Sequence, residues 1–343
     1  MKALRIVFTC GAGGPPYPWA DCSLRDGIGG SEECLILLAR ELAELGHDVT
    51  VVNNCREWAR EYNGVTYRHY EDTAVHELPT DLLVAWRNWY LLQDSRAAAR
   101  WLWCHDQPVG CHAPCQAEID RKDSAFNWID KVVVLNNWHR ELYHIIPDEK
   151  IFVCQIGIDQ RGYQSNYASQ LGERDLTRCL YFSHPNRGLD QLRSVWPRVR
   201  QAVPSATLAA YWWEENHYRQ PNESIGILPM SRRGPIAMAV QTLACGVFGF
   251  PCTFAPEISP ATTIKAQAGG CYPVYIEQGG MRDTLKYGRK CGSLAEFETA
   301  LIDTLRLSQM GALNDNRIEM IAWARDFYSW PLVAEQWVAE ARK

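Results

Sequence analysis

The chain has 343 residues and a formal net charge of −5 at neutral pH, and 47% of its residues are hydrophobic. Because a single core stops growing at roughly 250 to 300 residues, this length predicts two domains. The mild, dispersed negative charge argues against a nonspecific binder of polyanions. No apolar run reaches the roughly 18 residues of a membrane span, so we expect any membrane contact to be peripheral.

The cysteine content indicates a reducing compartment. The chain has 13 cysteines, an odd number, and its first residues do not resemble the charged, apolar and small-residue regions of a signal peptide. Disulfide frameworks are typical of small secreted chains. We therefore expect reduced, mostly buried thiols and a cytoplasmic protein.

The first half of the chain alternates strands with helices. Leu4 to Cys10 is an apolar run that predicts a strand, and glycines follow it in a long loop. Ser31 opens a helix whose leucines keep helical spacing, and Gly46 ends this helix before a strand at Asp48 to Asn53. This βαβ unit is notable for its loop, since loops beyond about 12 to 15 residues in compact domains are usually functional or disordered.

Two polar residues follow a later strand directly. We predict strands at Leu82 to Trp86, Trp101 to Cys104, Lys131 to Leu135 and Ile151 to Gln155, with a polar helix between the first two. His105 and Asp106 come at the end of the second of these strands. Because ligands of open parallel sheets bind at the carboxyl ends of the strands, His105 is a candidate catalytic residue; a purely structural histidine is the alternative.

The segment CHDQPVGCHAPC from Cys104 to Cys115 raises the question of a metal. Cys104, Cys111 and Cys115 lie within reach of two histidines, so zinc is one interpretation and buried thiols are the other. The spacing lacks the paired C-x₂-C of structural zinc sites, which favours thiols.

A polar stretch from Gly157 to Leu171 predicts the domain boundary, near residue 160. The second half then repeats the alternation, with strands predicted at Cys179 to Phe182, Leu208 to Trp212, Ile225 to Pro229 and Cys271 to Ile276, and with a short run at Cys252 to Ala255. Helices are predicted from Leu189 toward Val203, from Ile236 to Val247, and in the tail from Leu294, where Trp330 to Ala341 is amphipathic.

Arg187 lies in a predicted strand-to-helix loop of this second half. Its guanidinium suits bidentate binding of a diphosphate, and a solvated surface position is the alternative. Leu228 and Met230 flank the end of a short strand, where they are placed to line a nucleobase pocket. Trp212 and Trp213 would either support a ring or pack in the core.

The stretch from Pro256 to Pro273 predicts a phosphate site. Ser259 is placed to cap a helix, Pro260 suits the first helical position, and two glycines end the helix before the next strand. The free N–H groups around Ala261, Thr262 and Thr263 would then bind an anion. Glu257, just before them, would repel phosphate but accept hydrogen bonds from vicinal hydroxyls. Together these features predict a sugar diphosphate.

These motifs, in this order, resemble retaining glycosyltransferases of family 4 over nearly the whole chain. The residues that carry the resemblance are GGSE at Gly29 to Glu32, HD at His105 and Asp106, GID at Gly157 to Asp159, HPNRGL at His184 to Leu189, and E-x₇-K-A-Q-A-G-G from Glu257.

The resemblance implies the GT-B fold, an α/β architecture of two facing Rossmann-like domains with parallel sheets and a C-terminal helix that crosses back to the first domain. We expect an acceptor-side domain at residues 1–160, a nucleotide-sugar donor domain at 161–325, and the crossing helix at 326–343. The implied activity is a retaining hexosyl transfer from a UDP- or GDP-linked sugar, with no metal and no separate cofactor.

The resemblance also implies residue roles. Glu257 would read the donor sugar, Arg187 would contact the diphosphate, and His105 would contribute to the reacting sugar and the acceptor. Arg187 and helix N-termini would stabilise the departing diphosphate, which takes the proton as the acceptor attacks from the same face. The predicted donor-binding residues are Gly29, Gly30, Ser183, Arg187, Leu228, Met230, Glu257, Ala261, Thr262, Thr263 and Lys265. The predicted acceptor-binding residues are Gly13, Gly14, Tyr17, Trp19, His105 and Asp106.

Lys265 departs from the family pattern. Many members have a second glutamate eight positions after the first, often assigned to ribose hydroxyls, and a cation cannot accept those hydrogen bonds. Either another group holds the ribose, or Lys265 reaches a phosphate. The hypothesis is that Lys265 compensates for a phosphate loop in which only Arg187 is a clear cation.

Other functions stay open at this stage. The acceptor is a polysaccharide or lipid-linked glycan in the common case, with a protein, a small molecule or a nucleic-acid base as alternatives. A nucleotide-sugar epimerase or hydrolase, or a catalytically silent nucleotide-binding subunit, would share the architecture. The net charge argues weakly against duplex DNA, while the basic residues Arg232, Arg233, Arg282, Lys286, Arg289 and Lys290 argue weakly for some anionic partner.

Overall fold

The structure is a computed structural model that describes residues 2–93, 95–109, 112, 125–163, 173–211, 225–254 and 256–343. It divides into two compact units. The first unit comprises Met1–Leu24, Ile28–Gly157 and Trp330–Lys343, and the second comprises Arg25–Gly27 and Ile158–Ser329. Most of the predicted linker to Leu171, and the tryptophans at 212 and 213, lie outside the described residues.

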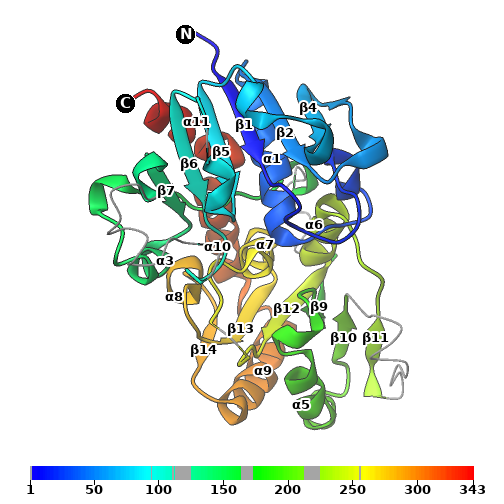
Figure 1. Cartoon of the computed structure of the whole chain (residues 1–343). Helices are drawn as coiled ribbons and strands as arrows, with labels where there is room; N and C mark the ends of the chain where they lie inside the picture. The colour runs from blue at the N-terminus through cyan, green and yellow to red at the C-terminus, as the bar shows by residue number, and fades with distance from the viewer. Residues whose placement is uncertain are drawn as a thin grey trace. The chain divides into compact units, whose positions relative to one another are not determined.

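The first unit is built on an eight-stranded sheet with the order β3-β4-β2-β1-β5-β6-β7-β8 (Figure 1). Every pair is parallel except β3 with β4, which form an antiparallel hairpin that is not among the predicted elements. The strands are β1 (Arg5–Thr9), β2 (Asp48–Asn53), β3 (Glu61–Tyr62), β4 (Val65–His69), β5 (Leu82–Trp86), β6 (Ala99–Trp103), β7 (Lys131–Val134) and β8 (Ile151–Val153).

The helices of the first unit include one from the far end of the chain. They are α1 (Gly30–Glu44), α3 (Asn137–Leu142) and α11 (Trp330–Ala341). In Figure 1 the red helix α11 lies beside α1, and the two helices are in contact. Trp337 of α11 packs on Phe8 of β1 and Trp103 of β6, with ring centroids 6.1 and 5.0 Å away. The predicted return of the last helix to the first domain is therefore confirmed.

The second unit has a six-stranded, wholly parallel sheet with the order β11-β10-β9-β12-β13-β14. Its strands are β9 (Asp175–Tyr181), β10 (Thr207–Ala210), β11 (Ile227–Pro229), β12 (Cys245–Phe250), β13 (Tyr272–Ile276) and β14 (Arg289–Cys291). Its helices are α5 (Leu189–Ala202), α6 (Pro235–Ala244), α7 (Ala261–Ala268), α8 (Met281–Thr284), α9 (Leu294–Gln309) and α10 (Asn314–Phe327). Helices α5 and α9 pack together, and α7 contacts α6 and α10.

Short 3₁₀ helices fill many of the connections. They are η1 (Asp21–Leu24), η2 (Arg56–Trp58), η3 (Tyr70–Asp72), η4 (Val75–Glu77), η5 (Trp89–Leu92), η7 (Ala125–Trp128), η8 (Asp148–Lys150), η9 (Gln160–Tyr163) and η10 (Pro185–Arg187). The polar helix predicted before Trp101 is wrong, since the described part of that segment contains η5 and the start of β6.

Strand β12 is the largest difference from the predicted elements, because it includes the end of a segment predicted to be helical. The predicted helix from Ile236 to Val247 ends at Ala244, and Cys245 to Phe250 form a buried strand between β9 and β13. The short run noted at Cys252 to Ala255 follows this strand, and its described residues 252–254 form neither helix nor strand. Because the apolar run continues unbroken from helix to strand, its periodicity does not mark the change.

Three buried arginines hold the carboxyl end of α7. Arg174 donates to the carbonyl of Gly269, Arg317 to that of Gly270, and Arg325 to that of Ala268, at 2.8, 3.2 and 2.9 Å. Cations are favourable at this end of a helix because its last carbonyls lack partners and carry partial negative charge. The guanidinium groups therefore anchor the helix whose other end belongs to the predicted phosphate site.

The strand orders locate the places where ligands bind in such sheets. In the first unit the order reverses between β1 and β5, and in the second unit between β9 and β12. At a reversal the connecting loops diverge and leave a crevice outside the carboxyl ends of the strands. The loops after these strands, together with the helices that follow them, carry most of the predicted site residues.

Candidate functional site

In the first unit, Arg87 and Asp106 form an ion pair at the carboxyl ends of β5 and β6. Arg87 Nε and Nη2 donate to the two carboxylate oxygens of Asp106 at 2.5 and 2.7 Å. Arg87 has a φ of 68°, a left-handed conformation that is uncommon for residues other than glycine and is often found at functional sites. Burial acts to raise the pKa of Asp106, but the hydrogen bonds and charge of Arg87 outweigh it and lower that pKa overall.

Glu32 lies beside this pair and occupies the amino end of its own helix. It is the third residue of α1, it is buried, and Arg87 Nη1 is 3.8 Å from its Oε1. A Cβ at the N-cap residue Gly29 would stand 2.1 Å from Glu32 Oε2, so a side chain there would displace the Glu32 carboxylate. Burial raises the pKa of Glu32, whereas its own backbone N–H and Arg87 act to lower it.

The position of Glu32 changes the interpretation of the predicted site residues Gly29 and Gly30. A carboxylate already lies among the N–H groups of this helix end, where an anionic ligand was predicted to bind. Glu32, Arg87, His105 and Asp106 thus form one group, which we call the first-unit cluster. Neither Glu32 nor Arg87 was selected from the sequence, although Arg87 directly follows a strand end and Glu32 is the glutamate of GGSE.

His105 is a buried, neutral imidazole. Its ring packs 4.6 Å from Trp103 and 6.0 Å from Trp86, measured between centroids. Burial lowers the pKa of His105 to about 3, and the charge of Arg87 adds to this effect. Within the described part of the chain, its Nε2 has no hydrogen-bond partner. Buried polar atoms are rarely left unpaired, so this nitrogen is suited to a ligand.

His139 supports the loop that carries Asp106. Its Nδ1 accepts from the backbone N–H of Leu135, so its Nε2 donates to the carbonyl of Asp106 at 3.0 Å. Burial lowers the pKa of His139 to about 4, although the Asp106 carbonyl partly opposes this. The imidazole is therefore held as one tautomer that fixes the backbone after β6.

Both buried histidines should make the fold less stable in mild acid. In the unfolded chain these two histidines bind protons below a pKa of roughly 6.5. In the folded chain they do so only below pKa values of about 3 and about 4. Stability is complete above about pH 6.5 and falls as the pH falls, by about 2 kcal/mol for each histidine at about pH 5. Urea unfolding at about pH 6.5 and at about pH 5 should therefore show a smaller loss of unfolding free energy for His139→Gln than for wild type. The exposed His76 provides the control His76→Gln; an equal loss in all three proteins would contradict the expectation.

The other predicted acceptor residues lie in the loop after β1. Gly13 and Gly14 follow this strand, and a Cβ at Gly14 would stand 3.6 Å from Glu32 Oε1. Tyr17 is 42% exposed, whereas Trp19 is completely buried against Trp86. Trp19 therefore packs in the core of the first unit, and of the two rings only Tyr17 offers an exposed surface.

In the second unit, Arg187 and Glu257 form an ion pair at the point where the strand order reverses. Arg187 Nη1 donates to Glu257 Oε1, and the Cys252 thiol lies 3.6 Å from the same oxygen. The Glu257 side chain is 12% exposed and that of Arg187 is 36% exposed. Burial raises the pKa of Glu257, while Arg187 and Cys252 act to lower it. We call Arg187, Cys252 and Glu257 the second-unit cluster.

Helix α7 follows Glu257, with differences from the predicted capping. Ser259 does not cap it: Pro260 is the N-cap residue, and the Ser259 hydroxyl has no hydrogen-bond partner among the described residues. The N–H of Thr263 is already bound to the carbonyl of Pro260, at 3.0 Å. The other two predicted anion-binding N–H groups, those of Ala261 and Thr262, precede this first hydrogen bond of the helix. They belong to the N–H groups that have no partner within the helix.

The remaining predicted donor residues surround the same edge of the sheet or lie deeper. Ser183 follows β9 and is half-buried, and Leu228 and Met230 lie at the end of β11, also half-buried. Lys265 is buried in the second turn of α7. Among the basic residues, Lys290 pairs with Glu277 at 2.6 Å and Arg289 with Asp303 at 3.9 Å.

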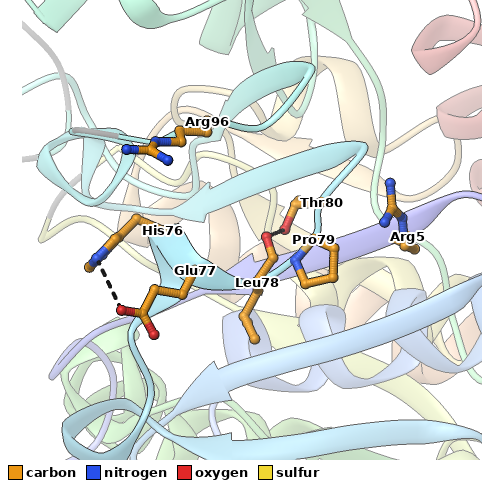
Figure 2. Close-up of a pocket in the computed structure, with 7 residues that line it drawn as sticks. All are labelled: Arg5, His76, Glu77, Leu78, Pro79, Thr80 and Arg96. Carbon is orange, nitrogen blue, oxygen red and sulfur yellow. Dashed lines mark hydrogen bonds and ion pairs between the residues drawn. The ribbon is translucent and has the colours of Figure 1, made fainter.

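A separate pocket lies near the amino ends of strands in the first sheet, opposite their carboxyl ends (Figure 2). It has a volume of about 570 Å³ and is lined by Arg5, His76, Glu77, Leu78, Pro79, Thr80 and Arg96. Arg5 is the first residue of β1, so the pocket lies at the amino ends of the strands. It is therefore away from the carboxyl edge that carries the first-unit cluster.

The described residues also bear on the questions of a metal site and a membrane span. Within the described ranges, no three or more His, Cys, Asp or Glu side chains are grouped to hold a metal. Cys111 and Cys115, which the zinc interpretation requires, lie outside those ranges. None of the helices in the described ranges combines the length and the apolar character that a membrane crossing needs.

No family model matches this chain, and no curated protein matches it either. Solved structures do match over its whole length. HepE of Anabaena, in complex with UDP and glucose, superposes with a TM-score of 0.70 at 16% identity, covering 98% of each chain. A glycosyltransferase of Rickettsia africae gives 0.73 at 12% identity, covering 100% of this chain and 98% of that one. The chain has the GT-B fold.

The catalytic domain of starch synthase IV of Arabidopsis thaliana, bound to ADP and acarbose, matches similarly. Its TM-score is 0.70 at 12% identity, with 99% of both chains covered. At such identities the likeness shows the fold alone. Which reaction this GT-B protein performs has to be argued from its own residues.

Proposed function

We propose that this protein is a retaining glycosyltransferase of the family 4 type, which moves a hexosyl group from a UDP- or GDP-linked sugar to a hydroxyl acceptor, with a glycan as the first candidate. The observation that carries the proposal is the pairing of Arg187 with Glu257 directly before the amino end of α7. A guanidinium and free N–H groups suit the diphosphate, and a carboxylate suits the hydroxyls of the sugar attached to it.

The proposed chemistry needs electrostatic stabilisation more than a side-chain nucleophile. The bond between the anomeric carbon and the diphosphate oxygen breaks, and Arg187 with the amino end of α7 stabilises the charge that develops on the leaving group. The acceptor hydroxyl attacks from the same face and passes its proton to that diphosphate oxygen. No step of this scheme requires a metal ion.

The first-unit cluster supplies hydroxyl-binding groups in this proposal. His105 is neutral at physiological pH, and its unpaired Nε2 can exchange a hydrogen bond with a sugar hydroxyl. Asp106, held by Arg87, would orient the acceptor side. Solved GT-B structures with UDP and glucose, or with ADP and acarbose, support ligands of this chemistry.

A nucleotide screen by thermal shift tests the proposal. We expect UDP or GDP to raise the melting temperature, because binding at a hundredfold excess over Kd stabilises the folded state by roughly 2.7 kcal/mol. Lys265→Ala should weaken this binding if Lys265 reaches a phosphate, and unchanged affinity would end that hypothesis. If neither diphosphate shifts the melting curve, the donor assignment fails. A donor sugar that changes configuration without any acceptor would instead indicate an epimerase.

A further inference from the structure

The Arg187–Glu257 pair would affect the binding of two ligands in each catalytic cycle, the nucleotide sugar and the diphosphate released from it. Both groups are partly or largely withdrawn from water, and each neutralises the other in the ligand-free protein. A buried charge that loses its partner is strongly destabilised. A ligand that separates Arg187 from Glu257 must therefore supply other hydrogen-bond donors to the Glu257 carboxylate.

The backbone around the pair is held closely. Gly188 has a φ of 106°, and a Cβ there would stand 2.7 Å from the carbonyl oxygen of Pro251, so the loop carrying Arg187 lies against the segment that leads to Glu257. Tyr181 donates to the carbonyl of His184, at 2.7 Å, and Gly280 donates to that of Glu257, at 2.7 Å. Rotation of the Arg187 side chain is thus the simplest way for a ligand to separate the pair.

A nucleoside diphosphate and a nucleotide sugar differ at this point. The diphosphate offers only anionic oxygens, so it can take Arg187 but leaves the Glu257 carboxylate with the Cys252 thiol as its remaining partner in the second-unit cluster. A nucleotide sugar carries hydroxyl groups, which donate to a carboxylate and restore its hydrogen bonds. We propose that the Arg187–Glu257 pair makes the site discriminate in favour of the nucleotide sugar and against the diphosphate released from it.

This inference rests on the proposed function and adds a role in product release. After transfer, the sugar leaves Glu257, and the carboxylate again competes with the diphosphate for Arg187. The return of the pair weakens the hold on the product, so the same residue that reads the sugar also promotes departure of the leaving group.

Titration calorimetry with UDP, GDP and ADP, and with UDP-glucose, GDP-glucose and ADP-glucose, tests the inference on the full chain. Glu257→Gln keeps the shape of the side chain but removes its charge. We expect it to bind the preferred diphosphate about tenfold more tightly than wild type and the matching nucleotide sugar more weakly, because hydrogen bonds to charged groups are stronger than neutral ones. In an Arg187→Met background the same change should no longer tighten diphosphate binding.

The surface pair of Arg198 and Glu298 provides a matched control. Its two hydrogen bonds are both 2.6 Å long, and Glu298→Gln removes the same charge from the same unit. The control should bind both ligands like wild type, and melting curves of all variants check that they are folded. If wild type binds none of the six nucleotides, the proposed function and this inference both fall. If wild type binds but Glu257→Gln holds the diphosphate no more tightly, or tightens equally without Arg187, the inference alone is overturned.

Discussion

Replacing Arg187 by methionine should slow cleavage of the bond between sugar and diphosphate in a nucleotide sugar by about 10²- to 10³-fold. This is the usual effect of removing one group that stabilises developing charge. Arg187 is the cation that lies beside Glu257 and before the amino end of α7. Because this charge develops mainly as the bond to the sugar breaks, the loss should appear in kcat more than in KM.

The measurement needs no knowledge of the acceptor. Transfer of the sugar to water also releases the diphosphate, so its release can be followed with the nucleotide sugar that binds best, with and without candidate glycans. Arg187→Lys keeps the charge without the fork geometry and should retain an intermediate rate. The exposed Arg198→Met, whose native side chain pairs with Glu298, serves as the control and should match wild type. A rate within threefold of wild type for Arg187→Met would contradict the proposed role.

The second large effect concerns stability, since Arg317→Ala should reduce the free energy of unfolding by about 3 to 5 kcal/mol. Arg317 is completely buried and donates to the carbonyls of Gly246 and Gly270 and to the Ser308 hydroxyl, at 3.0, 3.2 and 2.6 Å. Burial lowers its pKa to about 10, and nearby Arg174 adds to this effect, so the guanidinium still carries its charge at neutral pH. Its removal leaves buried carbonyls unpaired and a cavity beside them.

Urea unfolding followed by tryptophan fluorescence measures this loss. Arg306→Ala is the matched control, because Arg306 lies on the exposed side of α9 and donates a hydrogen bond to the carbonyl of Ala202 at 3.2 Å. Surface changes of this kind usually alter stability by about 0.5 kcal/mol or less. A loss below about 1 kcal/mol for Arg317→Ala would show that water or a shifted side chain replaces the guanidinium.

Much of the fold could be predicted because its signals are local. The apolar runs of β2 and β5, the helical spacing in α1 with Gly46 after it, and the amphipathic α11 all appear within short windows of sequence. Strand β12 was missed because its residues follow α6 without a turn signal, and the tertiary position between β9 and β13 decides its conformation.

The candidate site was only partly predictable for a related reason. Motifs indicated individual residues one at a time: His105 and Arg187 from their places after predicted strands, and Glu257 from its place before a predicted helix. They did not reveal Arg87, whose role depends on Asp106 in a neighbouring loop, or Glu32, whose carboxylate fills the end of its own helix. These contacts join residues 19 and 55 positions apart along the chain, respectively.

By itself, the sequence determined the alternation of strands and helices and the positions after the strands where polar side chains occur, because backbone propensity and hydrophobic periodicity act over a few residues. Only the tertiary structure decided which of those positions are neighbours. The parallel order that places β9 beside β12 brings Arg187 to Glu257 across 70 residues of chain, and the order β1-β5-β6 brings Glu32, Arg87 and Asp106 together. Strand order depends on burying both faces of each sheet, a requirement of the whole domain that no short segment contains.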